Sequence, residues 1–363
     1  MTALTETPPE AAGLPTPTAK RKGGGGLATY LVIRFLLIFP TILILVTLVF
    51  FLMRITGDPI TAALGGRLPA DQLEIRIHEA GYDRPLLVQY FEYLGQVFTG
   101  NFGRTISDNR AVTEMLTTFG TATLELAINA LIVAFIVGIP LGMIAAHRRD
   151  KGTDAGLRVF AILSYATPVF FAGLLLKLVF SVWLAWLPVD GRASTSTELS
   201  LGSLAAPTGV YWLDALRSGN LTAFWDVERH AVLPALALGL LTAGVFLRLV
   251  RTNLIGTLGK DYVEAGRSRG VSEFRLVTKH AYKPALIPII TIMGLQIALL
   301  LGGAVLTETT FEWKGLGFQL AQYLTARDFV AVQGIVVLLA VIVAVTNFIV
   351  DVVAALIDPR VRY

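Results

Sequence analysis

The sequence contains no cysteine, which excludes disulfide frameworks, thiolate metal sites and cysteine nucleophiles together. Histidine is also scarce, and none of its copies has H-E-x-x-H or other metal-ligand spacing. The four histidines are His78, His147, His230 and His280. No G-x-x-x-x-G-K-[ST] phosphate loop occurs, because the nearest stretch, 256–261, lacks both the spacing and the Ser or Thr. The chain therefore carries no ATPase site of that kind, and no nucleophile–base or metal constellation indicates an enzyme.

Charge is sparse as well. Only 15% of the residues are charged, whereas 54% are hydrophobic, and a soluble domain carries about 25% charged residues. The mean hydropathy is +0.67, and the apolar residues are concentrated in runs, which is typical of a protein built into a bilayer. A net charge of +4 can indicate nucleic-acid binding. The positions of the charges along the chain instead indicate the orientation of a membrane protein, as described below.

Six apolar runs are long enough to cross a hydrocarbon core of about 30 Å as helices. We therefore predict an all-α, polytopic membrane protein with six transmembrane helices. Pro168 lies inside the long third run and predicts a kink there, and Pro140 and Pro234 raise the same possibility in the second and fourth. The runs lie at about 30–53, 119–146, 157–187, 231–250, 284–307 and 331–357.

The basic residues fall on one side of these spans. With the N terminus inside, the inner segments hold 17 Lys and Arg against 8 Asp and Glu, and the outer segments hold 10 against 15. Short basic loops stay cytoplasmic, so we predict a cell-membrane protein with both termini in the cytoplasm. The basic composition is then mainly an orientation signal.

The chain divides into a tail and one membrane domain. Residues 1–29 are rich in Pro, Thr, Ala and Gly and are predicted to be a disordered cytoplasmic tail. Residues 30–363 form the six-helix domain, with an outer segment at 57–118, an outer loop at 188–230 and an inner loop at 251–283. Residues 86–94 of the outer segment have apolar positions at helical spacing. That face can pack on the bundle, contact a partner or lie among headgroups, and we expect packing on the bundle.

The inner loop carries the most informative pattern. Residues 261–269 favour a helix, Gly270 interrupts it, and a second helix leads toward the fifth span. A short helix, a turn and a second helix can fit a groove on another protein and carry its motion into the spans. The competing interpretation is that any inner loop is basic and partly helical.

Glu264, Ala265 and Gly266, with Gly270 four positions later, resemble the Glu-Ala-Ala…Gly loop of ATP-binding-cassette importer permeases. Gly266 replaces the commoner second alanine and lowers helix propensity without adding bulk. Further stretches resemble the B-type permease subunits of the dipeptide/oligopeptide/nickel group. These stretches are 34–40, 57–59, 83–90, 122–126, 302–308, 315–317 and 358–363.

The resemblance implies a type I importer permease fold in which Glu264, Ala265, Gly266 and Gly270 couple the chain to an ATPase. It implies a second homologous permease subunit, two ATPase subunits that bind ATP and Mg²⁺, and an extracytoplasmic solute-binding protein. This chain itself would then hold no cofactor and no metal. Short peptides are the expected cargo, although nickel complexes, glutathione and other small solutes use related permeases.

Charged residues within the spans form a second set of candidates. Lys177 lies ten residues before Leu187, or about 15 Å deep along a straight third span. Inserting a lysine at the centre of a membrane helix costs about 2.5–3.5 kcal/mol. Glu125 and Glu308 lie in the same half of the membrane, and Glu125 is the expected partner of Lys177. The group either lines the pathway or forms a structural ion pair. An ion-coupled secondary transporter that uses Glu125, Glu308 and Asp351 is the alternative function.

Overall fold

The computed structural model describes residues 27–55 and 57–357, with only the backbone at several positions between 287 and 303 and at 354. Within these residues the chain is helical apart from turns and isolated bridges. The elements of the first half are α1 (Leu27–Ile55), α2 (Pro59–Leu64), α3 (Ala70–Glu79), α4 (Leu86–Phe98), α5 (Val112–His147), α6 (Gly152–Ala166), α7 (Val169–Leu176) and the π-helix η1 (Lys177–Trp183). Those of the second half are α8 (Thr195–Gly202), α9 (Tyr211–Arg217), α10 (Leu221–Leu258), α11 (Asp261–Ser268), α12 (Glu273–Arg275), the π-helix η2 (Leu276–Ala281), α13 (Tyr282–Thr310), α14 (Leu316–Thr325) and α15 (Phe329–Ile357).

Five of the six predicted spans each fall on one helix, and the third, 157–187, is divided among α6, α7 and η1. In the described residues, α1, α5, α10 and α15 are each long and apolar enough to cross a membrane, and α6 with its continuation makes a fifth, bent candidate. The predicted fifth span, 284–307, lies within the 29-residue helix α13. The predicted tail at 1–29 lies outside the described residues as far as residue 26, and 27–29 begin α1.

The proline predictions have different outcomes. The chain bends by 105° between Gly152–Ala166 and Val169–Trp183, and Pro168 lies at that break as the residue before α7. The expected kink is confirmed there. Pro140 and Pro234 lie inside the unbroken helices α5 and α10.

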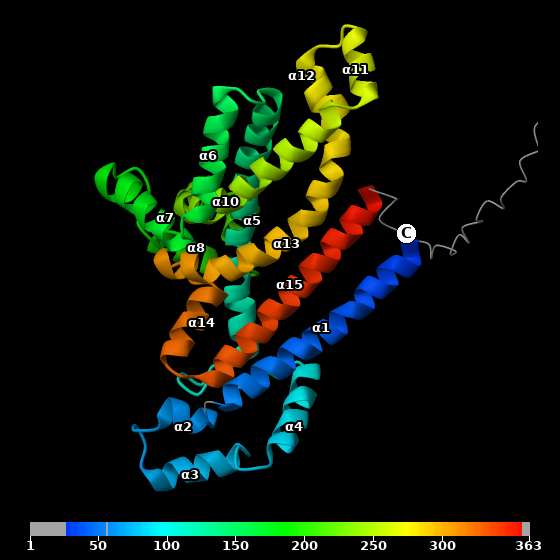
Figure 1. The fold of residues 1–363 in the computed structure, drawn as a ribbon. Helices are drawn as coiled ribbons and strands as arrows, with labels where there is room; N and C mark the ends of the chain where they lie inside the picture. The colour runs from blue at the N-terminus through cyan, green and yellow to red at the C-terminus, as the bar shows by residue number, and fades with distance from the viewer. Residues whose placement is uncertain (1–26, 56, 358–363) are drawn as a thin grey trace, which may run out of the picture.

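Helices α5 and α10 pack along each other and form the centre of the bundle (Figure 1). Glycine makes their close approach possible. A Cβ at Gly239 would lie 2.6 Å from the carbonyl oxygen of Ala130, and one at Gly142 would lie 2.7 Å from the Cβ of Val250. Small residues at such contacts let membrane helices approach closely. Helices α1 and α15 lie side by side at the edge of the bundle, where the ring centroids of Phe35 and Phe348 are 5.7 Å apart.

The segments between spans are folded. Helices α2, α3 and α4 occupy the first predicted outer segment, at the opposite end of the molecule from α11 and α12 (Figure 1). Tyr90 and Tyr93 of α4 pack against Phe50 of α1, with ring centroids 5.4 and 5.5 Å apart. The expected packing of this amphipathic helix on the bundle is therefore confirmed for the two tyrosines, whereas Leu87 and Phe91 of the same predicted face are 64% and 67% exposed.

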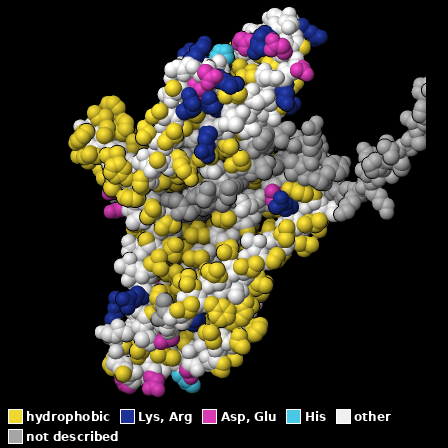
Figure 2. Space-filling view, viewed as in Figure 1, with side chains coloured by type: hydrophobic (Ala, Val, Ile, Leu, Met, Phe, Trp, Pro, Cys, Tyr) yellow, Lys and Arg dark blue, Asp and Glu magenta, His cyan; other side chains and the backbone are white. Residues whose placement is uncertain are grey.

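Figure 2 shows hydrophobic side chains over the middle of the visible face, with Lys and Arg gathered around the end that bears α11 and α12. Acidic side chains appear at both ends. An apolar band between charged ends is the arrangement that a bilayer requires.

Candidate functional site

The hairpin formed by α11, α12 and η2 (residues 261–281) has the helix–turn–helix form expected from the sequence. Helix α11 ends at Ser268, and Gly270 follows with φ +78°. The N–H of Gly270 donates to the carbonyl of Arg267 at 2.9 Å, and the N–H of Val271 donates to that of Gly266 at 3.1 Å. This pair of bonds is a Schellman motif, in which a left-handed residue ends the helix. Gly270 supplies that conformation without a Cβ clash.

One face of the hairpin is anchored to the bundle. Val263 and Leu276 are fully buried in a cluster with Ala146 of α5 and Leu254 of α10. A Cβ at Gly266 would lie 2.9 Å from the Cδ2 of Leu276, so glycine lets α11 lie close against η2. The hairpin therefore rests directly on the ends of two long helices.

The other face is exposed. The side chain of Glu264 is 67% exposed, Ala265 lies beside it, and Phe274 is 78% exposed. Arg267 donates to Glu264 at 2.6 Å and to Glu273 at 2.5 Å. The hydrogen bond from Arg267 lowers the pKa of Glu273, so the Glu273 carboxylate stays charged near neutral pH. The sequence-predicted residues Glu264 and Ala265 thus lie on the accessible surface of the hairpin.

A buried polar cluster lies at the other end of the bundle. Glu125 of α5 is fully buried and pairs with Arg192, whose side chain is 7% exposed. The backbone N–H of Trp212 donates to Glu125 at 3.2 Å, and Arg192 donates to the carbonyl of Gly209 at 3.0 Å. The pair thereby fixes the 188–230 loop to the middle helix of the bundle.

Glu308 has its own partners a short distance away. It accepts a hydrogen bond from the hydroxyl of Thr123 at 2.7 Å and one from the N–H of Phe318 at 2.9 Å. A Cβ at Gly315 would lie 2.5 Å from its carboxylate, so the glycines of the following turn make room for this group. Glu308 therefore holds the turn between α13 and α14 against α5.

The expected pairing of Lys177 with Glu125 is wrong. The Nζ of Lys177 donates to the carbonyl oxygen of Thr310 at 2.9 Å and lies 5.4 Å from the ring centroid of Phe311. Glu125 belongs to Arg192 instead. The depth of about 15 Å assumed a straight helix, and the 105° bend removes that assumption. The ammonium group of Lys177 is stabilised at the C-terminal end of α13, where carbonyl oxygens have no partner within the helix.

Each carboxylate predicted for an ion-coupled mechanism pairs with another group of the same chain. Glu125 pairs with Arg192, Glu308 binds Thr123 and a backbone N–H, and Asp351 lies 3.4 Å from Arg34. Among the described residues, no group of three or more His, Cys, Asp or Glu is placed to hold a metal ion. This geometry does not support the alternative function.

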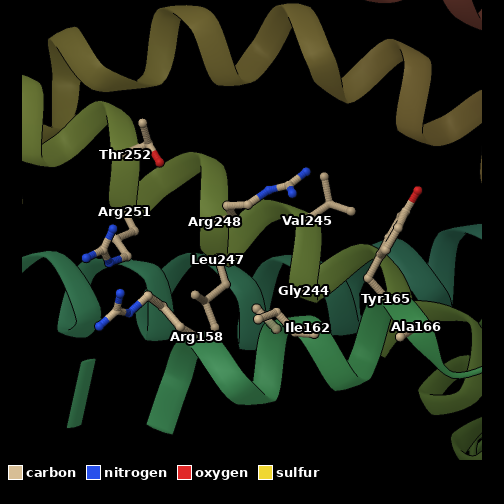
Figure 3. Close-up of a pocket in the computed structure, with 11 residues that line it drawn as sticks. Arg158, Ile162, Tyr165, Ala166, Gly244, Val245, Leu247, Arg248, Arg251 and Thr252 are labelled. Carbon is tan, nitrogen blue, oxygen red and sulfur yellow. The ribbon is translucent and has the colours of Figure 1, made fainter. Parts of the chain in front are cut away.

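A pocket of about 460 Å³ lies between α6 and α10, next to the inner loop (Figure 3). Asp154, at the start of α6, is fully buried and accepts two bonds from Arg251 at 2.6 and 2.8 Å. Arg248 also lines the pocket and forms no ion pair within the described part of the chain. Figure 3 shows Arg248 extending from α10 between the Arg251 end and the Tyr165 end of the pocket.

Sequence reasoning missed Arg192, Asp154 and Arg248. Arg192 lies in a polar loop and Asp154 in a basic one, where charged residues are ordinary. The sequence did indicate that Glu125 has a partner, because a carboxylate within an apolar run requires one, but it did not indicate which residue that is.

Two family models together match most of the chain. Residues 138–363 match the binding-protein-dependent transport system inner membrane component, and residues 27–117 match its N-terminal region.

Similar proteins are permeases of peptide transport systems. A di/tripeptide transport system permease protein from Pseudomonas aeruginosa is 38% identical over 329 residues, which cover 90% of this chain and 96% of that protein. The dipeptide transport system permease protein of Escherichia coli K12 is 35% identical with the same coverage. A probable D,D-dipeptide permease of E. coli K12 is 38% identical over 85% of this chain and 89% of that protein.

The fold also resembles a solved structure. A subunit in an inward-facing MetNI methionine ABC transporter aligns with a TM-score of 0.50 at 15% identity, over 68% of this chain and 97% of that chain. This likeness concerns the fold, which is that of a type I importer permease. On the evidence of the family models and of relatives that match over nearly their whole length, the chain belongs to the family of binding-protein-dependent transport system inner membrane components.

Proposed function

We propose that this chain is a permease subunit of an ATP-driven importer and forms half of a translocation pathway for short peptides. The relatives named for di- and tripeptide transport support the cargo class, because they match the chain along most of its length. The second half of the pathway would come from a homologous permease subunit. An extracytoplasmic solute-binding protein would deliver the peptide.

The hairpin at 261–281 is the observation that carries this proposal. Its inner face, with Val263 and Leu276, is packed on the ends of α5 and α10. Its outer face presents Glu264, Ala265 and Phe274 to solvent. A rigid element with one face fixed to long helices and the other accessible can transmit a displacement from a bound partner to the bundle. The partner would be an ATPase subunit, which binds the ATP and Mg²⁺ that this chain does not.

The pocket between α6 and α10 is the proposed inner part of the pathway. Arg248 lines it, and a guanidinium without a carboxylate partner is suited to the terminal carboxylate of a peptide. Arg248 is a better candidate for this contact than Lys177, because the ammonium of Lys177 already donates to Thr310. With the basic loops inside, both termini and the hairpin would lie in the cytoplasm.

Uptake of a labelled dipeptide by vesicles that contain the complete transporter tests the proposal. We expect uptake to require hydrolysable ATP, to stop with a non-hydrolysable analogue, and to continue when the proton gradient is collapsed. Uptake that follows the gradient and ignores ATP would overturn the proposal in favour of an ion-coupled transporter.

A further inference from the structure

A second pocket, of about 310 Å³, lies at the opposite end of the molecule from the hairpin. Its lining comes from the last turn of α1, the turn around residue 81, α4 and the first turns of α15. In Figure 1 these elements meet where the lower ends of α1 and α15 approach α4. The pocket is therefore separate from both the α6–α10 pocket and the hairpin.

Arg54 is held rigidly at this pocket. Its Nε donates to the Oε1 of Gln89 at 3.0 Å, and its guanidinium carbon lies 4.6 Å from the ring centroid of Tyr82 and 5.0 Å from that of Phe50. Gln89 is fixed in turn by donating to the carbonyls of Tyr82 and Arg84 at 3.0 and 2.8 Å. These contacts orient the guanidinium and leave its Nη1 to the pocket.

Three buried polar atoms of the pocket lining have no hydrogen-bond partner among the described residues: the Nη1 of Arg54, the hydroxyl of Tyr93 and the Nε2 of Gln333. Gln333 is 94% buried, with 6% of its surface exposed. Burial is the largest effect on the pKa of Tyr93 and raises it to about 12, although Gln333 lies close enough to the phenol to lower that pKa. The phenol therefore remains a neutral O–H group. Buried donors without acceptors are destabilising and rare. Their convergence from α1, α4 and α15 on one pocket indicates a bound acceptor.

The charge of the pocket gives the sign of that acceptor. Arg54 forms no ion pair in the described part of the chain. Glu92 also lines the pocket, but its carboxylate accepts from Arg84 at 2.5 Å. Arg104, the other cation of the lining, donates to the carbonyl oxygen of Asn109 at 2.6 Å. Within the described residues neither arginine has a carboxylate partner, and the hydroxyl of Tyr93 and the amide of Gln333 add two neutral donors. Oxyanions accept such bonds strongly.

We propose that this pocket binds a small oxyanion, a carboxylate or a phosphate group, through Arg54, Tyr93 and Gln333. The pocket volume lies within the range of about 300–1,000 Å³ that is usual for small-molecule sites. The oxyanion belongs either to a solute, such as the C-terminal carboxylate of a peptide, or to a phospholipid headgroup. In either case, its binding ties α1, α4 and α15 together.

Thermal unfolding of the purified full-length chain with added probes tests the site. The probes are inorganic phosphate, a dipeptide, the same dipeptide amidated at its C terminus, dioctanoyl phosphatidylglycerol and dioctanoylglycerol. We expect at least one oxyanion probe to raise the midpoint, and its matched probe without the oxyanion to have no effect. A response to the dipeptide and not to its amide assigns a solute carboxylate, and one to phosphatidylglycerol and not to dioctanoylglycerol assigns a lipid.

Three variants decide whether the response comes from this pocket. Gln333→Leu removes a donor at nearly constant volume, and Tyr93→Phe removes only a hydroxyl. Each should weaken binding of the effective probe by about tenfold, because a hydrogen bond to a charged group is lost. Gln322→Leu, at an exposed glutamine of α14, is the control and should bind as the unchanged chain does. If no probe raises the midpoint, or if all three variants bind alike, the proposal is overturned and water alone satisfies the three donors.

Discussion

Arg192 lies with its guanidinium carbon 3.7 Å from the ring centroid of Tyr211 and donates to the carboxylate of Glu125. Both charged side chains are almost completely buried. The loop that supplies Arg192 and Tyr211 therefore depends on one carboxylate of the central helix α5. Removal of either charge leaves the other buried without compensation.

We predict that Arg192→Met destabilises the chain by about 3–5 kcal/mol, because Glu125 is left as an unpaired buried charge. The double variant with Glu125→Met should recover most of this loss, because no charge is then buried. The thermal unfolding midpoint in detergent measures both effects. Equal stability of the single and double variants would show that the pair does not hold the loop.

The same argument applies at the other end of the bundle. Asp154→Asn should cost about 3 kcal/mol, because Arg251 loses its charged partner, and one of the two acceptor oxygens of a fully buried carboxylate becomes an NH₂ donor. Asp71→Asn, on the exposed surface of α3, is the matched control and should change stability by less than about 0.5 kcal/mol. Because Asp154 orients the arginines of the α6–α10 pocket, its replacement should also lower dipeptide uptake, whereas the control should not.

Two glycines of α10 provide a test of the helix packing. A Cβ at Gly239 would lie 2.6 Å from a backbone oxygen of α5, whereas nothing lies within 4 Å of a Cβ at Gly256. We expect Gly239→Ala to destabilise the chain by about 1–3 kcal/mol through overpacking. Gly256→Ala should instead stabilise it by up to about 1 kcal/mol through helix propensity. Unfolding midpoints that shift in the same direction would contradict the close approach of α5 and α10.

The spans could be predicted from the sequence because the length of an apolar run reports membrane crossing directly. The break after Gly270 could be predicted as well, because few residues other than glycine adopt a positive φ. Arg192 could not be assigned to Glu125, since the two lie 67 positions apart and a buried arginine in a loop leaves no periodic signal. The predicted pairing of Lys177 with Glu125 was wrong for a related reason. The depth of Lys177 in the membrane depends on the angle of the bend at Pro168, and the sequence predicts the bend but not its angle.

The exposed face of the hairpin gives the sharpest prediction about function. Glu264→Arg should leave membrane insertion and the unfolding midpoint nearly unchanged, since the side chain of Glu264 is 67% exposed. It should nevertheless weaken the association of the ATPase subunits and abolish dipeptide uptake, because a charge is reversed at the proposed contact. Glu114→Arg, at an exposed glutamate in the first turn of α5, is the matched control and should retain both. Co-purification of the ATPase subunits with each variant measures association separately from uptake. Normal association and uptake in Glu264→Arg would show that the ATPase does not bind this face. That result would leave the energy source of transport undecided.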